Sequence, residues 1–217
     1  MSSAQTSVEI AEQFESIEQQ RRADLAGMWV FLGTEMLFFG GMFAAFYIYR
    51  FEEPAIFAAA AGKMDLVLGT INTAILLTSS LFMSLADPAM EGRRRGTALA
   101  MITIALLLGL GFLSIKGYEY NKEVHEHLAP ILGMTFHYDG PQPVPAQKFF
   151  VFDFALTGLH AVHMTIGVGA LVVALVSVWR WRDPARLERQ VRITGLYWAF
   201  VDVMWIFIYP TLYLLRS

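Results

Sequence analysis

The chain has 217 residues, of which 56% are hydrophobic and 16% charged, and its formal net charge is -3. This composition is too apolar for a soluble domain of this length and predicts an integral membrane protein. Cysteine is absent, which excludes disulfides, thiolate metal sites and a copper centre that needs two cysteines.

The chain begins with a polar, acidic tail, residues 1–23, which we expect in the cytoplasm. Within it, Ile10, Phe14 and Ile17 recur at helical spacing. We therefore expect residues 7–22 to form either an amphipathic helix, on the membrane surface or against a partner, or a disordered tail.

Residues 24–217 contain five apolar runs, each long enough to span a membrane, since a helix needs about 20 residues to cross a hydrocarbon core of about 30 Å. The fold class that follows is all-α, a polytopic bundle of five transmembrane helices. The runs are residues 25–49, 66–85, 97–115, 149–179 and 193–215.

The arginines alternate between the connections in a way that predicts the topology. They gather in the tail and in the second and fourth connections, which lie on one face of a five-span protein. By the positive-inside rule, this face is cytoplasmic, so the N-terminus lies inside and the C-terminus in the periplasm. The positive residues assigned to the opposite face are Arg50, Lys63, Lys116, Lys122, Lys148 and Arg216.

The third connection, residues 118–147, contains four prolines and three histidines. The prolines predict an irregular outer loop, not a helix. His125 and His127 are two residues apart and would not share a helical face, so the sequence does not favour a metal site there.

Polar side chains at membrane depth are the candidates for function. Each buried ionisable group costs at least ~2.5 kcal/mol, so such a residue faces protein or water and has a partner. At a rise of about 1.5 Å per residue, Glu35 and Asp202 lie ~15 and ~14 Å from the same face. The full set is Glu35, Asn72, Asp153, His160, His163 and Asp202.

His160 and His163 share one helical face, because they are three residues apart. One hypothesis is that Glu35 and one of these histidines, with or without Asp202, form a buried hydrogen-bonded cluster that fixes the helix arrangement. Glu35 would then be either neutral or ionised beside a charged partner. The alternative is that Glu35 exchanges protons or binds an ion. A haem held by two histidines needs facing helices, and the sequence has no other histidine at this depth.

Aromatic residues, one proline and several glycines predict how the helices are anchored in the membrane and packed on one another. Trp179, Trp181, Tyr209 and Tyr213 fit interfacial aromatic belts, and Pro210 predicts a kink in the last helix. Small residues let helix backbones approach closely. The glycines expected to do so are Gly33, Gly40, Gly41, Gly109, Gly111, Gly158, Gly167 and Gly169.

Several segments resemble one known family. LTGLHAVHMTIGVGAL at 156–171 resembles the T-G-x-H-x-x-H-x-x-x-G helix of subunit III of haem-copper oxidases, and YWAFVDVMWIFIYP at 197–210 is similar to that family's closing helix. Three further segments match in the same order, so that the resemblance covers residues 24–215. They are MWVFLGTEMLFFGGMFAAFY at 28–47, GTINTAILLTSSLFM at 69–83 and IKGYEYNKEVHEHLAP at 115–130.

The resemblance implies a non-redox subunit of a respiratory terminal oxidase that uses cytochrome c or quinol, located in the bacterial inner membrane. Such a subunit packs on subunit I and supports its stability and proton uptake. Haem and copper are expected in partner subunits, and no catalytic residue, cofactor or metal is expected in this chain. Other expected partners are subunit II and further oxidase subunits, a respiratory supercomplex and membrane lipids, including bound phospholipid, but no nucleic acid. Glu35, His160, His163 and Asp202 would form the buried polar cluster.

The chain departs from the family pattern in two ways. It resembles the short five-helix form, which lacks the first two helices of the large form, so the lipid cleft between those parts does not carry over. Ala199 stands where the family often has histidine. Two other functions stay open: an accessory subunit of a nitric oxide reductase, and a stand-alone proton- or ion-coupled transporter using Glu35, His160 and Asp202.

Overall fold

The computed structural model describes residues 16–130, 136–138, 140, 142–180 and 184–216. Within these ranges the chain is helical, and five helices are long and apolar enough to span a membrane, which confirms the predicted fold class. The elements are α1 (Ile17–Glu52), α2 (Pro54–Ala61), α3 (Leu66–Glu91), α4 (Arg95–His125), α5 (Pro143–Arg180), α6 (Pro184–Tyr209) and η1 (Pro210–Leu214), the last a π-helical segment.

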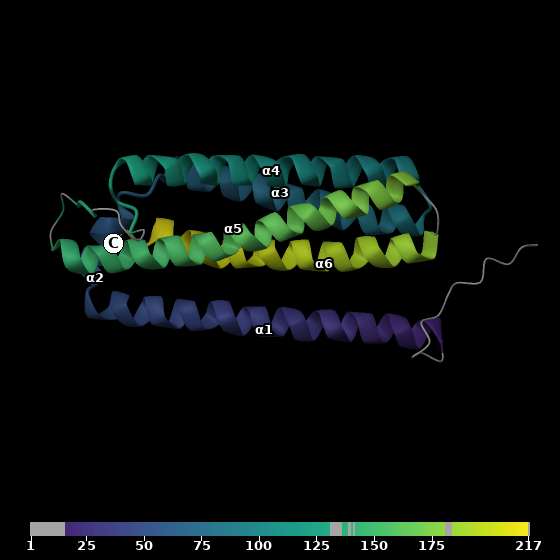
Figure 1. Cartoon of the computed structure of the whole chain (residues 1–217), viewed down its shortest axis with the longest axis horizontal. Helices are drawn as coiled ribbons and strands as arrows, with labels where there is room; N and C mark the ends of the chain where they lie inside the picture. The colour runs from purple at the N-terminus through teal and green to yellow at the C-terminus, as the bar shows by residue number, and fades with distance from the viewer. Residues whose placement is uncertain (1–15, 131–135, 139, 141, 181–183, 217) are drawn as a thin grey trace, which may run out of the picture.

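Helices α3 to α6 form a four-helix bundle in which each helix packs on two others. α3 contacts α4 and α6, and α5 likewise contacts α4 and α6. Helix α1 lies outside this ring, along α5 and α6 (Figure 1). We call the end where η1 lies, and where α3 and α5 begin, the C-terminal end. The opposite end, where α4 and α6 begin, is called the arginine-rich end.

Helix α1 meets the bundle along a narrow stripe. Its buried hydrophobic side chains are Leu32, Phe39 and Phe46, which are seven residues apart, as expected for one edge of a helix seam. Large side chains such as Trp29 and Leu37 are exposed on its other faces. In a membrane these faces must meet lipid or helices of another protein.

Polar caps explain where two of the helices begin. The Ser16 hydroxyl accepts a hydrogen bond from the backbone N–H of Gln19 at 3.1 Å, at the start of α1. Asp65 Oδ1 accepts from the N–H groups of Val67 and Leu68, both at 3.1 Å, at the start of α3. Each cap satisfies donors that the first helical turn leaves without a partner.

The predicted irregular segment 118–147 is shorter in the structure, because α4 continues to His125 and α5 already begins at Pro143. Both predicted limits of the loop, residues 118 and 147, were therefore wrong, each for its own reason. Pro143 and Pro145 lie in the first turn of α5, where the missing N–H costs no helical hydrogen bond. At the other end, α4 continues past the apolar run because its charged residues Lys116, Glu119 and Glu123 are buried in the bundle.

Three further expectations change or fall outside the described residues. Residues 7–15 of the predicted amphipathic helix, and Trp181, lie outside them, whereas Ile17 already belongs to α1. At Pro210 the α-helix gives way to the wider π-helical segment. Tyr213 was expected at the membrane interface, but its side chain is fully buried at 0% exposure, because it bonds to charged residues of α4.

Gly109 of α4 and Gly167 of α5 leave room for the Trp198 side chain of α6, which packs against both helices. A Cβ atom on Gly109 would lie 2.6 Å from Trp198 Cη2, and one on Gly167 would lie 2.9 Å from the same indole. The indole N–H of Trp198 also donates to Ser79 Oγ at 3.1 Å. The other predicted packing glycines make no close approach to the residues that the structure describes. Gly33, Gly40, Gly41, Gly111 and Gly169 have none of these residues' atoms within 4 Å of an added Cβ, and Gly158 has only an ordinary contact at 3.8 Å.

Replacing Gly109 with alanine should therefore lower the thermal stability of the subunit. The added methyl group would overlap Trp198, and overpacking of this kind costs about 1–3 kcal/mol. Gly111→Ala is the matched control on the same helix, and we expect it to leave the melting temperature unchanged or slightly higher. Thermal unfolding of both purified variants in the same detergent measures the difference. Equal melting temperatures would contradict the close packing described here.

Candidate functional site

Glu35 of α1 and His163 of α5 meet across the seam between α1 and the bundle. Glu35 lies three residues after Leu32 and four before Phe39, so it belongs to the same buried stripe. Its Oε2 atom lies 3.1 Å from His163 Nε2. The two side chains are 23% and 10% exposed.

The second ring nitrogen of His163 fixes how protons are distributed in this pair. His163 Nδ1 lies 2.9 Å from the backbone oxygen of Leu159. Because a carbonyl oxygen can only accept, Nδ1 must carry the hydrogen. Nε2 then either accepts a hydrogen bond from a protonated Glu35 or, itself protonated, donates to an ionised Glu35. In both arrangements the pair has zero net charge, which avoids the cost of an isolated charge in the membrane.

Aromatic side chains from α1 and α6 pack around His163. Phe39 and Phe200 have ring centroids 5.4 and 6.4 Å from that of His163. Tyr197 donates its hydroxyl to the backbone oxygen of His163 at 3.2 Å. The site therefore draws on α1, α5 and α6, and a partly exposed edge of Glu35 remains open to the membrane or to another subunit.

The other two residues of the predicted cluster lie elsewhere. His160 is 1% exposed and packs between aromatic rings, with centroid distances of 5.5 Å to Phe112 and 5.2 Å to Trp205. Neither of its ring nitrogens has a hydrogen-bond partner among the described residues. Asp202 is buried on α6, where its carboxylate interacts with Ser80 of α3. The contact with Glu35 is made by His163.

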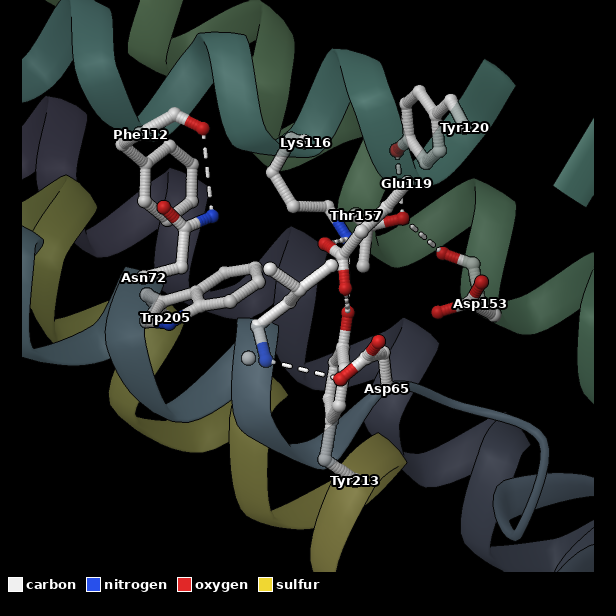
Figure 2. A network of polar contacts seen from close by, with 12 residues as sticks. Asp65, Asn72, Phe112, Lys116, Glu119, Tyr120, Asp153, Thr157, Trp205 and Tyr213 are labelled. Atoms are coloured by element: carbon white, nitrogen blue, oxygen red, sulfur yellow. Dashed lines mark hydrogen bonds and ion pairs between the residues drawn. The ribbon is translucent and has the colours of Figure 1, made fainter. Parts of the chain in front are cut away.

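A second group of charged residues lies inside the bundle near its C-terminal end (Figure 2). Lys116 of α4 is 3% exposed, and its ammonium lies 2.9 Å from Glu119 Oε2 and donates to Tyr213 Oη at 2.9 Å. The Tyr213 hydroxyl in turn donates to Glu119 Oε1 at 3.2 Å. Three side chains from α4 and η1 thus form a closed triangle of polar contacts.

Aromatic faces and further hydrogen bonds enclose this triangle. The Lys116 ammonium lies 5.2, 5.5 and 5.6 Å from the ring centroids of Tyr120, Trp205 and Tyr213, distances at which a cation is attracted to a ring. Thr157 donates to the backbone oxygen of Asp153 at 2.6 Å, so the Tyr120 hydroxyl, 2.7 Å from Thr157 Oγ1, is the donor in that bond.

Sequence reasoning placed Lys116 on the outer surface and Tyr213 at the membrane interface, and it did not single out Glu119 or Glu123. The signal was present in the spacing of three charged residues. Lys116, Glu119 and Glu123 are separated by three and four residues, which places them on one face if the helix continues. The prolines of the following segment suggested that the helix had already ended, so this spacing was not used.

The arginine-rich end carries its own ion pairs. Arg192 of α6 contacts Asp87 and Glu91 of α3 at 3.2 and 2.6 Å. Arg189 contacts Asp24 of α1 at 2.9 Å, which ties the start of α1 to the bundle. A hollow of about 540 Å³ lies between the adjoining ends of α5 and α6. Its lining includes Ser177, Arg180, Arg186, Arg189 and Thr194.

In the part of the chain that the structure describes, no three histidine, aspartate or glutamate side chains are grouped so that they could hold a metal ion. The two polar sites are therefore an isolated carboxyl–imidazole pair and a charged network built around a lysine. Both arrangements can hold protons and connect helices.

Comparison with known proteins identifies relatives over most of the chain. Residues 19–217 match the family model described as cytochrome c oxidase subunit III. The chain is similar to the quinol oxidase subunit 3 of Bacillus spizizenii, with 30% identity over 89% of this chain and 88% of the relative. It is also similar to the cytochrome c oxidase subunit 3 of a Synechocystis species, with 33% identity over 87% of this chain and 74% of the relative.

A third relative differs in its length. The haem-copper oxidase subunit I+III of Aeropyrum pernix is 28% identical over 87% of this chain, but the match covers only 22% of that protein. The similarity is thus confined to one part of a much longer polypeptide.

Proposed function

Because the chain belongs to the cytochrome c oxidase subunit III family, we propose that it acts as the non-redox subunit III of a respiratory haem-copper terminal oxidase. It is a multi-pass membrane protein, and we place it in the bacterial inner membrane with the arginine-rich end in the cytoplasm. The haem and copper centres belong to partner subunits, and either cytochrome c or quinol supplies their electrons.

The observation that carries this proposal is the Glu35–His163 pair at 3.1 Å. A carboxyl and an imidazole that together carry no net charge can exchange a proton without placing a bare charge in the membrane. They also join α1, which otherwise has a narrow buried stripe, to α5. The pair thus supports two roles. It fixes α1 against α5, and it provides a group that exchanges protons beside the partner that reduces oxygen.

The partner that fits best is subunit I. The name of the Aeropyrum relative joins subunits I and III in one polypeptide, and the match to our chain covers a minor part of it. Exposed apolar faces on α1 provide ample surface for partner helices or lipid. Subunit II and a respiratory supercomplex would be further partners of the same assembly.

Bound phospholipid is part of the proposal at the arginine-rich end. The hollow of about 540 Å³ is lined by three arginines, Arg180, Arg186 and Arg189. Guanidinium groups donate paired hydrogen bonds that match phosphate geometry. A phospholipid headgroup is the phosphate source that a membrane supplies at this level.

A transporter fits the structure less well. Transporters commonly bind their cargo near the mid-membrane, where two spans are broken. In the described residues the five long helices are continuous through their middle, and the π-helical segment lies only at the C-terminal end. His160 and Asp202, which such a transporter would use, lie apart from Glu35 in separate contacts.

Purification through an affinity tag on this chain tests the proposal. We expect a larger haem-containing subunit to co-elute, with the absorption spectrum of a haem-copper oxidase and oxygen-reducing activity. A colourless protein that moves ions when reconstituted alone would contradict the proposal in favour of a transporter. A co-eluting partner that reduces nitric oxide and not oxygen would contradict it in favour of a nitric oxide reductase.

A further inference from the structure

Two buried carboxyl groups near the Lys116 triangle have oxygen atoms without hydrogen-bond partners among the described residues. Asp153 of α5 is 1% exposed, and neither of its carboxylate oxygens has a hydrogen-bond partner among the described residues. Glu123 of α4 is 8% exposed, and its Oε2 atom likewise has none. A buried carboxylate normally receives several hydrogen bonds, so both groups require an explanation.

The two acids belong to one electrostatic cluster. Lys116, Glu119 and Glu123 are buried on one face of α4. Asp153 of α5 lies beside Lys116 and Glu119 (Figure 2). Asp153 interacts electrostatically with Lys116 and Glu119, and Glu123 interacts with Asp153 and Lys116. The other titratable groups that face the cluster are Tyr120 of α4, His160 of α5, Tyr213 of η1 and, at its rim, Glu126.

The charges of this cluster do not balance if every acid is ionised. Three carboxylates would face one ammonium, and that ammonium already contacts Glu119 and Tyr213. The two further negative charges would share that one ammonium, and Asp153 would have no hydrogen-bond donor among the described residues. A buried acid in this position takes up a proton, which removes the charge and turns one acceptor oxygen into a donor.

We propose that Asp153 and Glu123 form a proton-binding site of this subunit, which holds one exchangeable proton at neutral pH. The site is separate from the Glu35–His163 pair. Asp153 precedes His163 by ten residues on α5, which corresponds to about 15 Å along the helix. The proton, once taken up, leaves the cluster with one ammonium and two carboxylates.

Glu123 is the route by which this proton exchanges with the solution. It lies at the rim of the buried cluster, and it interacts with the exposed Glu126, which directly follows the last residue of α4. Asp153 has no such exposed neighbour on its own helix, since Phe149, Phe150 and Leu156 around it are buried. The site therefore opens toward the C-terminal end of the bundle.

A proton fits the site better than a metal cation does. The Lys116 ammonium already occupies the centre of the cluster and would repel a second cation. The described side chains also do not include three grouped acids and histidines suited to a metal ion.

Infrared spectroscopy of the intact complex tests this proposal, because protonated carboxylic acids give a carbonyl-stretch band that ionised carboxylates lack. Spectra of the lipid-reconstituted complex would be recorded as a function of pH, in H₂O and in D₂O. The variants are Asp153→Asn and Glu123→Gln, and Glu126→Gln is the control because Glu126 is exposed. Co-purification of the haem-containing subunit shows that each variant has assembled.

We expect the wild type to show a titrating carboxylic-acid band that shifts in D₂O. Loss of this band at neutral pH in Asp153→Asn or in Glu123→Gln supports the proposal, since removing one acid lets the other ionise beside Lys116. The control should keep it. A band retained in both variants, or no such band in the wild type, would overturn the proposal. Displacement of the band by added Na⁺ or Ca²⁺ at constant pH would also overturn it, because the site would then bind a cation.

Discussion

Replacing Lys116 with methionine should destabilise the subunit so strongly that little of it assembles. The change removes the one positive charge of a cluster that buries Glu119, Glu123 and Asp153. Methionine fills a similar volume, so the loss is mainly electrostatic. Removing one partner of a buried ion pair typically costs about 3–5 kcal/mol. The yield of folded subunit in membranes and its melting temperature in detergent measure the effect.

Lys148→Met is the matched control for this variant. Lys148 is exposed at the same end of the bundle, and its ammonium lies 4.7 Å from the Tyr49 ring centroid. Such an exposed contact contributes about 0.5–1 kcal/mol, so we expect a small loss. Adding Glu119→Gln to Lys116→Met should recover part of the stability, because both charges of the pair are then absent. A Lys116→Met subunit as stable as the wild type would contradict the role given to this network.

Replacing Glu35 with alanine should weaken the attachment of the subunit and shorten the working lifetime of the oxidase, while leaving its haem content intact. His163 Nε2 would lose its partner, and an unsatisfied buried polar group costs about 1–3 kcal/mol. The stripe that holds α1 would retain Leu32, Phe39 and Phe46 but lose its polar contact. The ratio of this subunit to haem after purification, and the number of turnovers before inactivation, measure the two effects.

Glu35→Gln separates the contribution of the helix contact from the contribution of proton exchange at Glu35. The amide can still donate to His163 Nε2, so the helix contact remains, but it cannot exchange a proton at neutral pH. We expect Glu35→Gln to retain the subunit as the wild type does and to inactivate early, as Glu35→Ala does. A wild-type lifetime in Glu35→Gln would assign the residue to packing alone. Unchanged attachment and lifetime in Glu35→Ala would contradict both roles.

Much of the fold followed from the sequence because the membrane simplifies the problem. Five long apolar runs must become helices, since only hydrogen-bonded helices satisfy the backbone in lipid in such a chain. The estimated depth of Glu35 and the spacing of His160 and His163 limited the possible partners of Glu35 to these two histidines and Asp202. Which histidine faces α1 depends on how the helices rotate and cross, and composition does not determine that.

The charged network was harder to predict because its residues lie at the end of a span. A lysine just beyond an apolar run is normally taken for an interfacial residue, and a tyrosine in the last helix for a membrane anchor. In the structure, α4 extends past the apolar run, and η1 turns Tyr213 inward so that the two meet. The glycines show the same limit: Gly109 and Gly111 are equivalent in sequence terms, but only Gly109 faces Trp198.

Removal of this subunit from the purified oxidase, followed by its return, tests the central proposal most directly. The measurement is the number of turnovers before inactivation, together with the haem spectrum and the rate of proton uptake. We predict an unchanged haem spectrum after removal, early inactivation and slower proton uptake, with recovery on adding the wild-type subunit but not Glu35→Ala. Haem leaving together with this chain, or a lifetime and proton uptake that do not depend on it, would contradict the proposal.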